Sequence, residues 1–275
     1  MQSHDVTREP TARSLVLELL SVLGEDGPHG LPVASLLRAG QLFDLEGGAI
    51  RVALSRLRAR GLVEAPRRGH YRLAPAGQAV AAHVERWREV PARVRPWDGG
   101  WIAVATGGLP RADRAAQRTR ERALSLLGFR PLRPGLEVRP DNLDQDAAEL
   151  AARLEELGLD AGVPVFRAEG LGVAEEEAAT LWDAAELDGR CAALLGAVEA
   201  LEAEMPALSW EAGACESFRV GGAVLRHFAY DPLLPAPIVD VALRHALVEA
   251  MARLDAIGRE CWREALHEER EEDAA

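Results

Sequence analysis

The sequence contains no lysine, so all 32 of its basic residues are arginine. Such uniform use of arginine is typical of a biased genome composition as much as of a binding surface, and arginine alone is therefore weak evidence of function. Aromatic residues are also scarce, at 5% of the chain, but 48% of the residues are hydrophobic. The chain is thus able to bury an apolar core, which excludes general intrinsic disorder.

Cysteine is almost absent. The three cysteines, Cys191, Cys215 and Cys261, are far apart and form no CxxC pair. Their number and spacing argue against a disulfide framework or a zinc site and favour a reducing compartment. The histidines are scattered without an HExxH motif, and no GxSxG, GxGxxG or P-loop motif is present. We therefore expect no catalytic residue, no metal, no cofactor and no enzymatic activity.

Long hydrophobic runs are missing too. No run approaches the roughly 18 apolar residues that suggest a membrane-spanning helix. The stretch MQSHDVTREP is polar and does not resemble a signal peptide. We expect a cytoplasmic protein that has no membrane partner.

The net charge of −12 argues against a protein that coats nucleic acid generally. The charge is unevenly distributed, however, with +3 over residues 1–88 and −15 over residues 89–275. Residues 47–88 contain nine arginines against only Glu64 and Glu85. We interpret this stretch as a basic island on an acidic body, which would restrict the direction from which DNA approaches.

The most informative stretch runs from Glu46 to Leu73. The spacing of Ile50, Leu54 and Leu57 predicts a short amphipathic helix, which Gly61 ends. Its opposite face is small at the centre and cationic at the edges, and such a face suits the DNA major groove. That face consists of Gly48, Arg51, Val52, Ser55 and Arg56.

Two predicted strands follow this helix, at 62–65 and 71–73, around the basic tip PRRGH. Two further helices are expected before it, at 12–23 and 32–38. Arginine-rich helix faces and basic hairpin tips are each usually ordinary solvated surface. Together, in this order and spacing, they are the layout of a winged helix-turn-helix, and they predict DNA binding.

We expect six residues to contact DNA. Arg51, Ser55 and Arg56 would reach bases or adjacent phosphates from the recognition helix. The wing would contribute the other three, namely Arg67, Arg68 and His70.

A different pattern begins after a fourth helix (74–89) and a linker between Pro91 and Pro96. Strands and helices alternate there in a way that predicts a small ferredoxin-like sandwich. The elements are a strand at 101–105, a helix at 111–127, an interrupted strand or hairpin at 129–138, a helix at 144–157 and a strand at 163–168. From Val173 onward the pattern is helical, with helices at 175–182, 188–204, 215–230 and 238–267.

The predicted fold class is therefore α+β and multidomain. We expect a winged-helix DNA-binding domain over residues 1–90, a ferredoxin-like domain over 97–171 and a helical domain over 173–268. The helical domain has enough apolar surface to serve for dimerisation. Trp182, Trp210 and Trp262 are interpreted as core or interface aromatics rather than as a ligand cage.

Four runs of sequence resemble a known family, in the same order. They are IRVALSRLRARGLVE…GHYRLAPAG (50–77), WDGGWIAV (97–104), LLGFRPLRPGLEVRP (126–140) and HFAYDPLLP (227–235). With them the chain resembles the PaaX-type regulators, named for the repressor of the phenylacetate degradation operon. The resemblance covers nearly the whole chain and implies the same three domains. It also implies a dimeric repressor that an acyl-CoA releases from DNA, phenylacetyl-CoA in the best-known members.

One departure affects the effector. Many members continue after DPLLP into a Trp-Pro-Gly segment, whereas this chain has Ala236-Pro237-Ile238. For this reason phenylacetyl-CoA itself is not carried over. Arg226, His227 and Tyr230 lie near DPLLP and could contact an anionic effector such as a CoA phosphate. The other interpretation, which we favour, is a helix end paired with the acidic surface.

The sequence as a whole predicts a homodimeric, one-component repressor that an acyl-CoA or aryl-CoA controls. Its two recognition helices would enter successive major grooves, about 34 Å apart, on a palindromic operator. The alternative is a metabolite-binding or enzymatic protein whose winged helix serves only as a protein–protein module.

Overall fold

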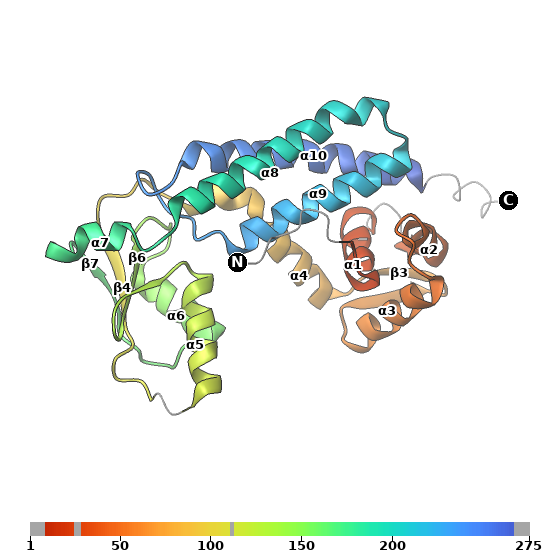
Figure 1. Cartoon of the computed structure of the whole chain (residues 1–275). Coiled ribbons are helices and arrows are strands. Elements are labelled where there is room, and N and C mark those ends of the chain that lie inside the picture. The colour runs from red at the N-terminus through yellow and green to blue at the C-terminus, as the bar shows by residue number, and fades with distance from the viewer. Residues whose placement is uncertain (1–8, 25–28, 111–112, 267–275) are drawn as a thin grey trace. The chain divides into compact units, whose positions relative to one another are not determined.

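The computed structural model describes residues 9–24, 29–110 and 113–266. It is an α+β structure in which helix predominates and the strands form small antiparallel sheets (Figure 1), so the α+β prediction is confirmed. The chain divides into two compact units. The first combines the chain up to Trp87 with Leu194–Arg226 and the chain from Glu249 onward. The second combines Arg88–Ala193 with His227–Val248.

This division differs from the three consecutive domains that the sequence suggests. Three long helices, α8 (Ala184–Glu204), α9 (Trp210–Tyr230) and α10 (Val241–Ala265), each contribute residues to both units. At about 1.5 Å per residue, a helix of this length reaches across the diameter of a small domain. One helix can therefore supply side chains to two cores, which a reading of consecutive segments does not anticipate.

The first unit begins with α1 (Ala12–Leu23), as expected. Its N-terminus carries a capping box, because the Thr11 hydroxyl accepts from the Ser14 amide (3.1 Å) and the Ser14 hydroxyl from the Thr11 amide (3.0 Å). Helices α2 (Val33–Gln41) and α3 (Gly47–Ala59) follow. Helix α2 continues three residues beyond the predicted end at Arg38.

The hairpin of this unit consists of β2 (Val63–Arg67) and β3 (His70–Leu73). It is tighter than the sequence predicts, because Arg67 already pairs with His70. A third strand, β1 (Leu31–Pro32), pairs antiparallel with β3 and gives the order β1-β3-β2. Two residues are too few to show an alternating pattern, so β1 has no signal in the sequence.

The apolar core of the first unit lies between α1, α2, α3 and the hairpin, with α9 and α10 adding to it. Helix α3 contributes Ile50, Leu54 and Leu57, the face that the spacing predicts. Gly40 allows α2 to approach this face, because a Cβ atom there would lie 2.9 Å from Ile50 Cγ1. After β3 come α4 (Pro75–Glu85) and a 3₁₀ helix (Arg86–Arg93) in place of the single helix expected to residue 89.

The second unit contains a four-stranded antiparallel sheet and two helices. In chain order the elements are β4 (Trp101–Ala105), α5 (Arg114–Leu126), β5 (Arg130–Arg133), β6 (Leu136–Pro140), α6 (Ala147–Leu157) and β7 (Val165–Ala168). The sheet order is β5-β6-β4-β7. Residues 129–138 thus form a hairpin, one of the two predicted forms. The expected start of the first helix, residue 111, lies outside the described residues.

Helices α5 and α6 cover one face of this sheet (Figure 1). On the other face Trp101 and Ala103 join a core that also contains Ala178 and Trp182. Side chains alternate along a strand, so the buried Ile102 points toward the helices. Helix α7 (Glu175–Ala179) ends three residues earlier than predicted.

The other two tryptophans that the sequence assigns to a core or an interface differ in solvent exposure. Trp262 is buried in the core of the first unit, whereas the side chain of Trp210 is 52% exposed. No helix within the described ranges combines the length and the apolarity that a bilayer crossing requires.

A buried arginine joins the ends of three segments in the second unit. Arg139 is 1% exposed, and its guanidinium donates to the carbonyl oxygens of Leu127, Pro140 and Pro232 and to Asn142 Oδ1. The Asn142 amide in turn donates to the Leu233 carbonyl oxygen at 2.7 Å. Burial lowers the pKa of Arg139 to about 9. The guanidinium thus supplies donors to carbonyls that burial removes from water.

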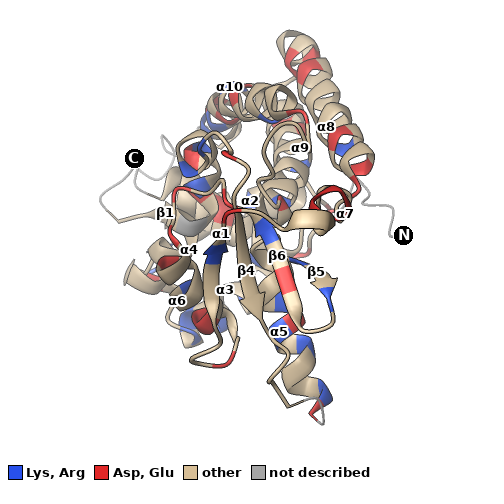
Figure 2. Ribbon diagram, turned by 90° about the vertical axis from the view of Figure 1, so that its left-hand side faces the viewer, with Lys and Arg blue, Asp and Glu red and all other residues tan. Residues whose placement is uncertain are grey.

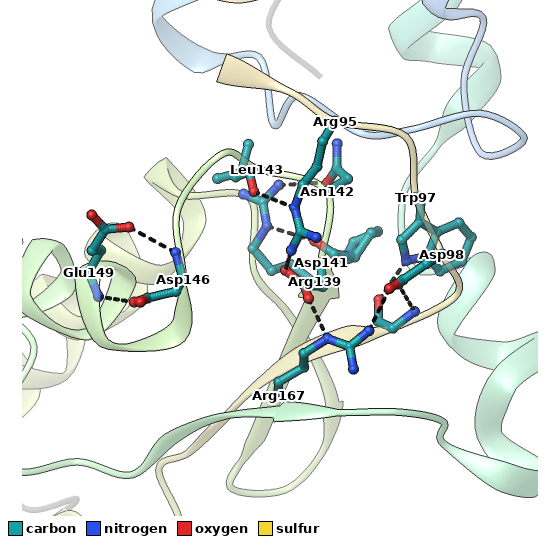
Figure 3. A network of polar contacts seen from close by, with 12 residues as sticks. Arg95, Trp97, Asp98, Arg139, Asp141, Asn142, Leu143, Asp146, Glu149 and Arg167 are labelled. Carbon is teal, nitrogen blue, oxygen red and sulfur yellow. Dashed lines mark hydrogen bonds and ion pairs between the residues drawn. The ribbon is translucent and has the colours of Figure 1, made fainter. Parts of the chain in front are cut away.

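Figure 3 shows a second part of this network, around Asp141. The buried carboxylate accepts from Arg95 Nη2 (2.6 Å) and from Arg167 Nε (2.7 Å). Arg167 Nη2 also donates to Asp98, whose other oxygen accepts from the Gly100 amide. A Cβ atom on Gly100 would lie 2.5 Å from Arg167 Nη2, so glycine makes room for the guanidinium.

Replacing Arg139 tests this account. Arg139→Met keeps an apolar stem but leaves several buried acceptors without a donor. We expect it to lower the free energy of unfolding by about 3 kcal/mol. The measurement is the urea denaturation midpoint of the full chain. The control is Arg118→Met on the exposed surface of α5, which should change stability by no more than about 0.5 kcal/mol. Equal stability of the two variants would contradict the role assigned to Arg139.

Candidate nucleic-acid interface

Helix α3 presents a polar face to solvent, opposite its buried apolar face. Arg51, Ser55 and Arg58 lie on it at i, i+4 and i+7, and all three are exposed. The 3.6-residue period places them in one row along the helix. The row is polar at every position and carries a guanidinium at both ends.

This row borders a groove of about 790 Å³ between α3 and the hairpin. The three α3 side chains form one wall. Residues of and next to the hairpin form the other, and these are Val63, Glu64, Ala65, Tyr71 and Ala74. The helix face and the hairpin that the sequence links to one function thus border a common groove.

The hairpin tip carries further cations. Arg67 and Arg68 are exposed, and Gly69 has a φ of +78° that closes the turn. His70 is half-buried, with Nδ1 3.4 Å from the Arg68 carbonyl oxygen and its ring edge-on to His29. The tip therefore presents two arginines to solvent, while the histidine supports the turn.

The arginines of this surface are not neutralised by the protein's own acids. Within the described residues, Arg51, Arg58, Arg67 and Arg68 take part in no ion pair, and the same holds for Arg56. The one carboxylate in the groove wall, Glu64, is paired with Arg72 (Nε to Oε1, 2.6 Å). The surface can therefore accept an external polyanion without first breaking an internal ion pair.

Of the six residues predicted to contact DNA, Arg51 and Ser55 line the groove, and Arg67, Arg68 and His70 lie at the hairpin tip. Arg56 is exposed on α3 but is not among the residues that line the groove. Arg58, which the sequence reasoning missed, does line it. The signal was available, because Arg58 stands seven residues after Arg51 and therefore falls on the same helical face.

The three effector candidates lie in the last turn of α9. Tyr230 is 66% exposed and Arg226 is half-buried. His227 borders a very small cavity of about 10 Å³ together with Asp231 and Arg244, which form a buried ion pair (2.9 Å). Burial lowers the pKa of His227, which favours its neutral form. A space of this size holds no more than about one water molecule, so it offers no room for an effector.

Comparison with known proteins identifies the N-terminal segment. Residues 11–77 match the family model described as PaaX-like protein. This segment is PaaX-like. The match confirms the resemblance inferred from the sequence, over the residues that run from the cap of α1 to the first turn of α4.

The chain is also similar to a solved structure of the uncharacterized protein Rv0674 from Mycobacterium tuberculosis. The sequences are 26% identical and the TM-score is 0.60, over 90% of this chain and 97% of that one. No protein of curated function matched the chain.

The other three family-like runs lie outside the PaaX-like segment, and the resemblance based on them stays a prediction. In the second unit, however, they converge. Arg139 of the run 126–140 donates to the carbonyl oxygen of Pro232 in the run 227–235, and Gly128 packs against the same proline. Asp98 of the WDGG turn reaches this network through Arg167 and Asp141.

Two glycines of the PaaX-like segment test the turn geometry. At both Gly48 and Gly69 a Cβ atom would meet nothing within 4 Å, but only Gly69 has a positive φ. We expect Gly69→Ala to destabilise the fold by about 1–2 kcal/mol, because an L-residue is strained there. Gly48→Ala, in helix α3, should instead stabilise it by about 0.5 kcal/mol. Thermal denaturation measures both, and effects of the same sign would refute the assignment.

Proposed function

We propose that this protein is a sequence-specific DNA-binding transcriptional regulator. The first unit would be a winged helix-turn-helix in which α3 is the recognition helix and the β2–β3 hairpin is the wing. The observation that carries the proposal is the groove between them, which Arg51, Ser55 and Arg58 border. Neither of these arginines forms an ion pair with an acid in the part of the chain that the structure describes.

The chemistry of this groove suits duplex DNA. Arginine binds guanine edges and phosphates bidentately, and a small residue such as Ser55 permits close approach to the bases. The tip arginines, Arg67 and Arg68, would bind phosphate beside the groove that α3 enters. His70 would act on the wing by supporting the turn. Arg56, exposed outside the groove lining, would contact a flanking phosphate.

The charge distribution supports this orientation. The charged residues of helix α8 are five acids, which are red in Figure 2, and one arginine. Acidic helices of this kind repel DNA, whereas the 47–88 stretch attracts it. The basic surface would therefore be the face that meets the duplex.

The finer assignments rest on the family resemblance. We propose a homodimeric repressor in the cytoplasm, without enzymatic activity, that binds a palindromic operator. The βαββαβ order of the second unit, with sheet order β5-β6-β4-β7, supports a ferredoxin-like domain. The helical segment would serve dimerisation and effector binding.

Alanine substitution of the arginines at the hairpin tip and of those on α3 distinguishes the roles of the two sets. The Arg67→Ala, Arg68→Ala double variant should weaken binding to all duplexes alike and reduce the slope of log K against log salt by about 2. Arg51→Ala and Arg58→Ala should instead change the preferred sequence, with about 1–3 kcal/mol of lost discrimination per base contact. The assay is selection from a randomised duplex library followed by gel shift. Arg118→Ala is the matched control.

The same experiments distinguish DNA binding from the alternative, in which the winged helix serves only as a protein–protein module. If the wild-type chain selects no duplex at low salt, the groove is a protein–protein surface and the DNA proposal is overturned. If duplexes are selected but neither variant set alters binding, DNA is bound by another surface and the residue assignments fail.

Effector control has its own test. A titration of the protein–operator complex with acyl-CoA and aryl-CoA thioesters should release the DNA, with a coupling of about 1–3 kcal/mol. The measurement is fluorescence anisotropy of labelled operator, with free CoA as the control. Unchanged operator affinity across the series would remove the effector assignment and leave DNA binding untouched.

A further inference from the structure

The first unit contains an apolar cavity that is separate from the candidate interface. Its volume is about 230 Å³, and none of its lining residues borders the groove described above. It lies between α1 and α4, with Leu225 of α9 and Asp255 of α10 completing the wall. Its apolar lining consists of Leu17, Val22, Leu73, Val80, Ala81, Val84, Trp87 and Leu225.

The cavity is accessible from solvent along α4. The side chains of Val80 and Val84 belong to its lining, and they are 47% and 46% exposed. Exposure of these valines to water is unfavourable, and an apolar ligand in the cavity would cover part of their surface. An apolar cavity of about 150 Å³ holds benzene, so this one has room for a ring with a short substituent.

Three carboxyl groups line the cavity, and they differ in their hydrogen bonds to arginine. Arg259 donates to both Glu85 of α4 and Asp255 of α10, at 3.2 and 2.8 Å. Glu18 of α1 makes no hydrogen bond to any group that the structure describes. Burial raises the pKa of Glu18 to about 8, and Asp255 and Glu85 add to the rise more than Arg259 offsets it.

This arrangement selects among ligands by charge. An anion would meet the carboxylates of Glu85 and Asp255, so a CoA phosphate or a free carboxylate is disfavoured here. A purely apolar molecule would fill the space and remove water from the half-buried Glu18 without giving it a hydrogen-bond partner, which is costly. An ammonium group supplies hydrogen-bond donors and a positive charge to Glu18.

We propose that this cavity is a binding site for a small organic monocation, with a primary ammonium paired to Glu18 and a ring-sized apolar body among the leucines and valines. When the ammonium binds, the Glu18 carboxyl ionises and gives its proton to solvent. The site does not depend on the DNA-binding function proposed above, and neither proposal requires the other.

The test uses three probes of one shape on the full chain. Benzylamine, benzyl alcohol and benzoate differ in charge at the same ring. Calorimetry at pH 7, in two buffers of different ionisation enthalpy, should show benzylamine binding at least tenfold more tightly than benzyl alcohol. It should also show release of close to one proton per benzylamine bound, and benzoate should not bind. Equal binding of the three probes, or no binding of benzylamine, would overturn the proposal.

Variants assign the effect to Glu18. Glu18→Gln should bring benzylamine and benzyl alcohol to similar affinities and abolish proton release, whereas Glu199→Gln, on the exposed surface of α8, should change neither. Ala81→Phe should fill the cavity and weaken benzylamine and benzyl alcohol alike. Unchanged benzylamine affinity in Glu18→Gln would overturn the proposal.

The pH dependence of stability gives a readout without ligand. A carboxyl that titrates near 4.5 when unfolded and near 8 when folded costs the folded state stability as the pH rises through that window. Glu18→Gln should therefore melt at a higher temperature than wild type above pH 5, with a difference that grows up to pH 8. Benzylamine should reduce that difference, because it binds wild type more tightly than Glu18→Gln and therefore stabilises wild type more. Parallel pH profiles of the two proteins, or equal stabilisation of both by benzylamine, would contradict the role of Glu18.

Discussion

The apolar contact between α1 and α3 is the constraint on which the rest of the first unit depends. Leu15 and Leu19 of α1 and Ile50 and Leu54 of α3 are at most 2% exposed and belong to one core. Burying this face of α3 holds its other face outward, so the row that begins at Arg51 is presented without any polar contact to hold it. Each of these side chains stabilises the fold by about 1.5–3 kcal/mol through burial, more than an exposed arginine contact could supply.

Helix α1 also explains why the cavity lies where it does. Leu15 and Leu19 of α1 pack in the core shared with α3. Leu17 and Glu18, on another face of the same helix, line the apolar cavity between α1 and α4. An amphipathic helix normally turns such a carboxylate to water. Packing against α4 and α10 leaves Glu18 half-buried instead, and Arg259 donates to Glu85 and Asp255. The raised pKa of Glu18 follows from that placement.

The second unit is organised by hydrogen bonding as much as by apolar packing. Arg139 and Asn142 bind the carbonyl oxygens of Pro232 and Leu233, about 90 residues further along the chain. Arg244 binds Asp231 and the Leu234 carbonyl oxygen in the same segment. A proline-containing segment cannot satisfy all of its backbone groups in a regular element, so buried side chains must supply the donors. Arg139 and Pro232, which belong to two different family-like runs, are in contact for this reason.

The sequence by itself determined the features that depend on neighbouring residues. The periodicity of Ile50, Leu54 and Leu57 predicted the buried face of α3, and the basic tip PRRGH predicted the turn between the two strands, because both signals lie within a few residues. The PaaX-like segment was recognisable for the same reason. Only the tertiary structure decided that β1 pairs with β3, that the long helices supply two units, and that Glu18 lines an apolar cavity. These features depend on which distant segments pack together, and that is set by the whole core rather than by any local pattern.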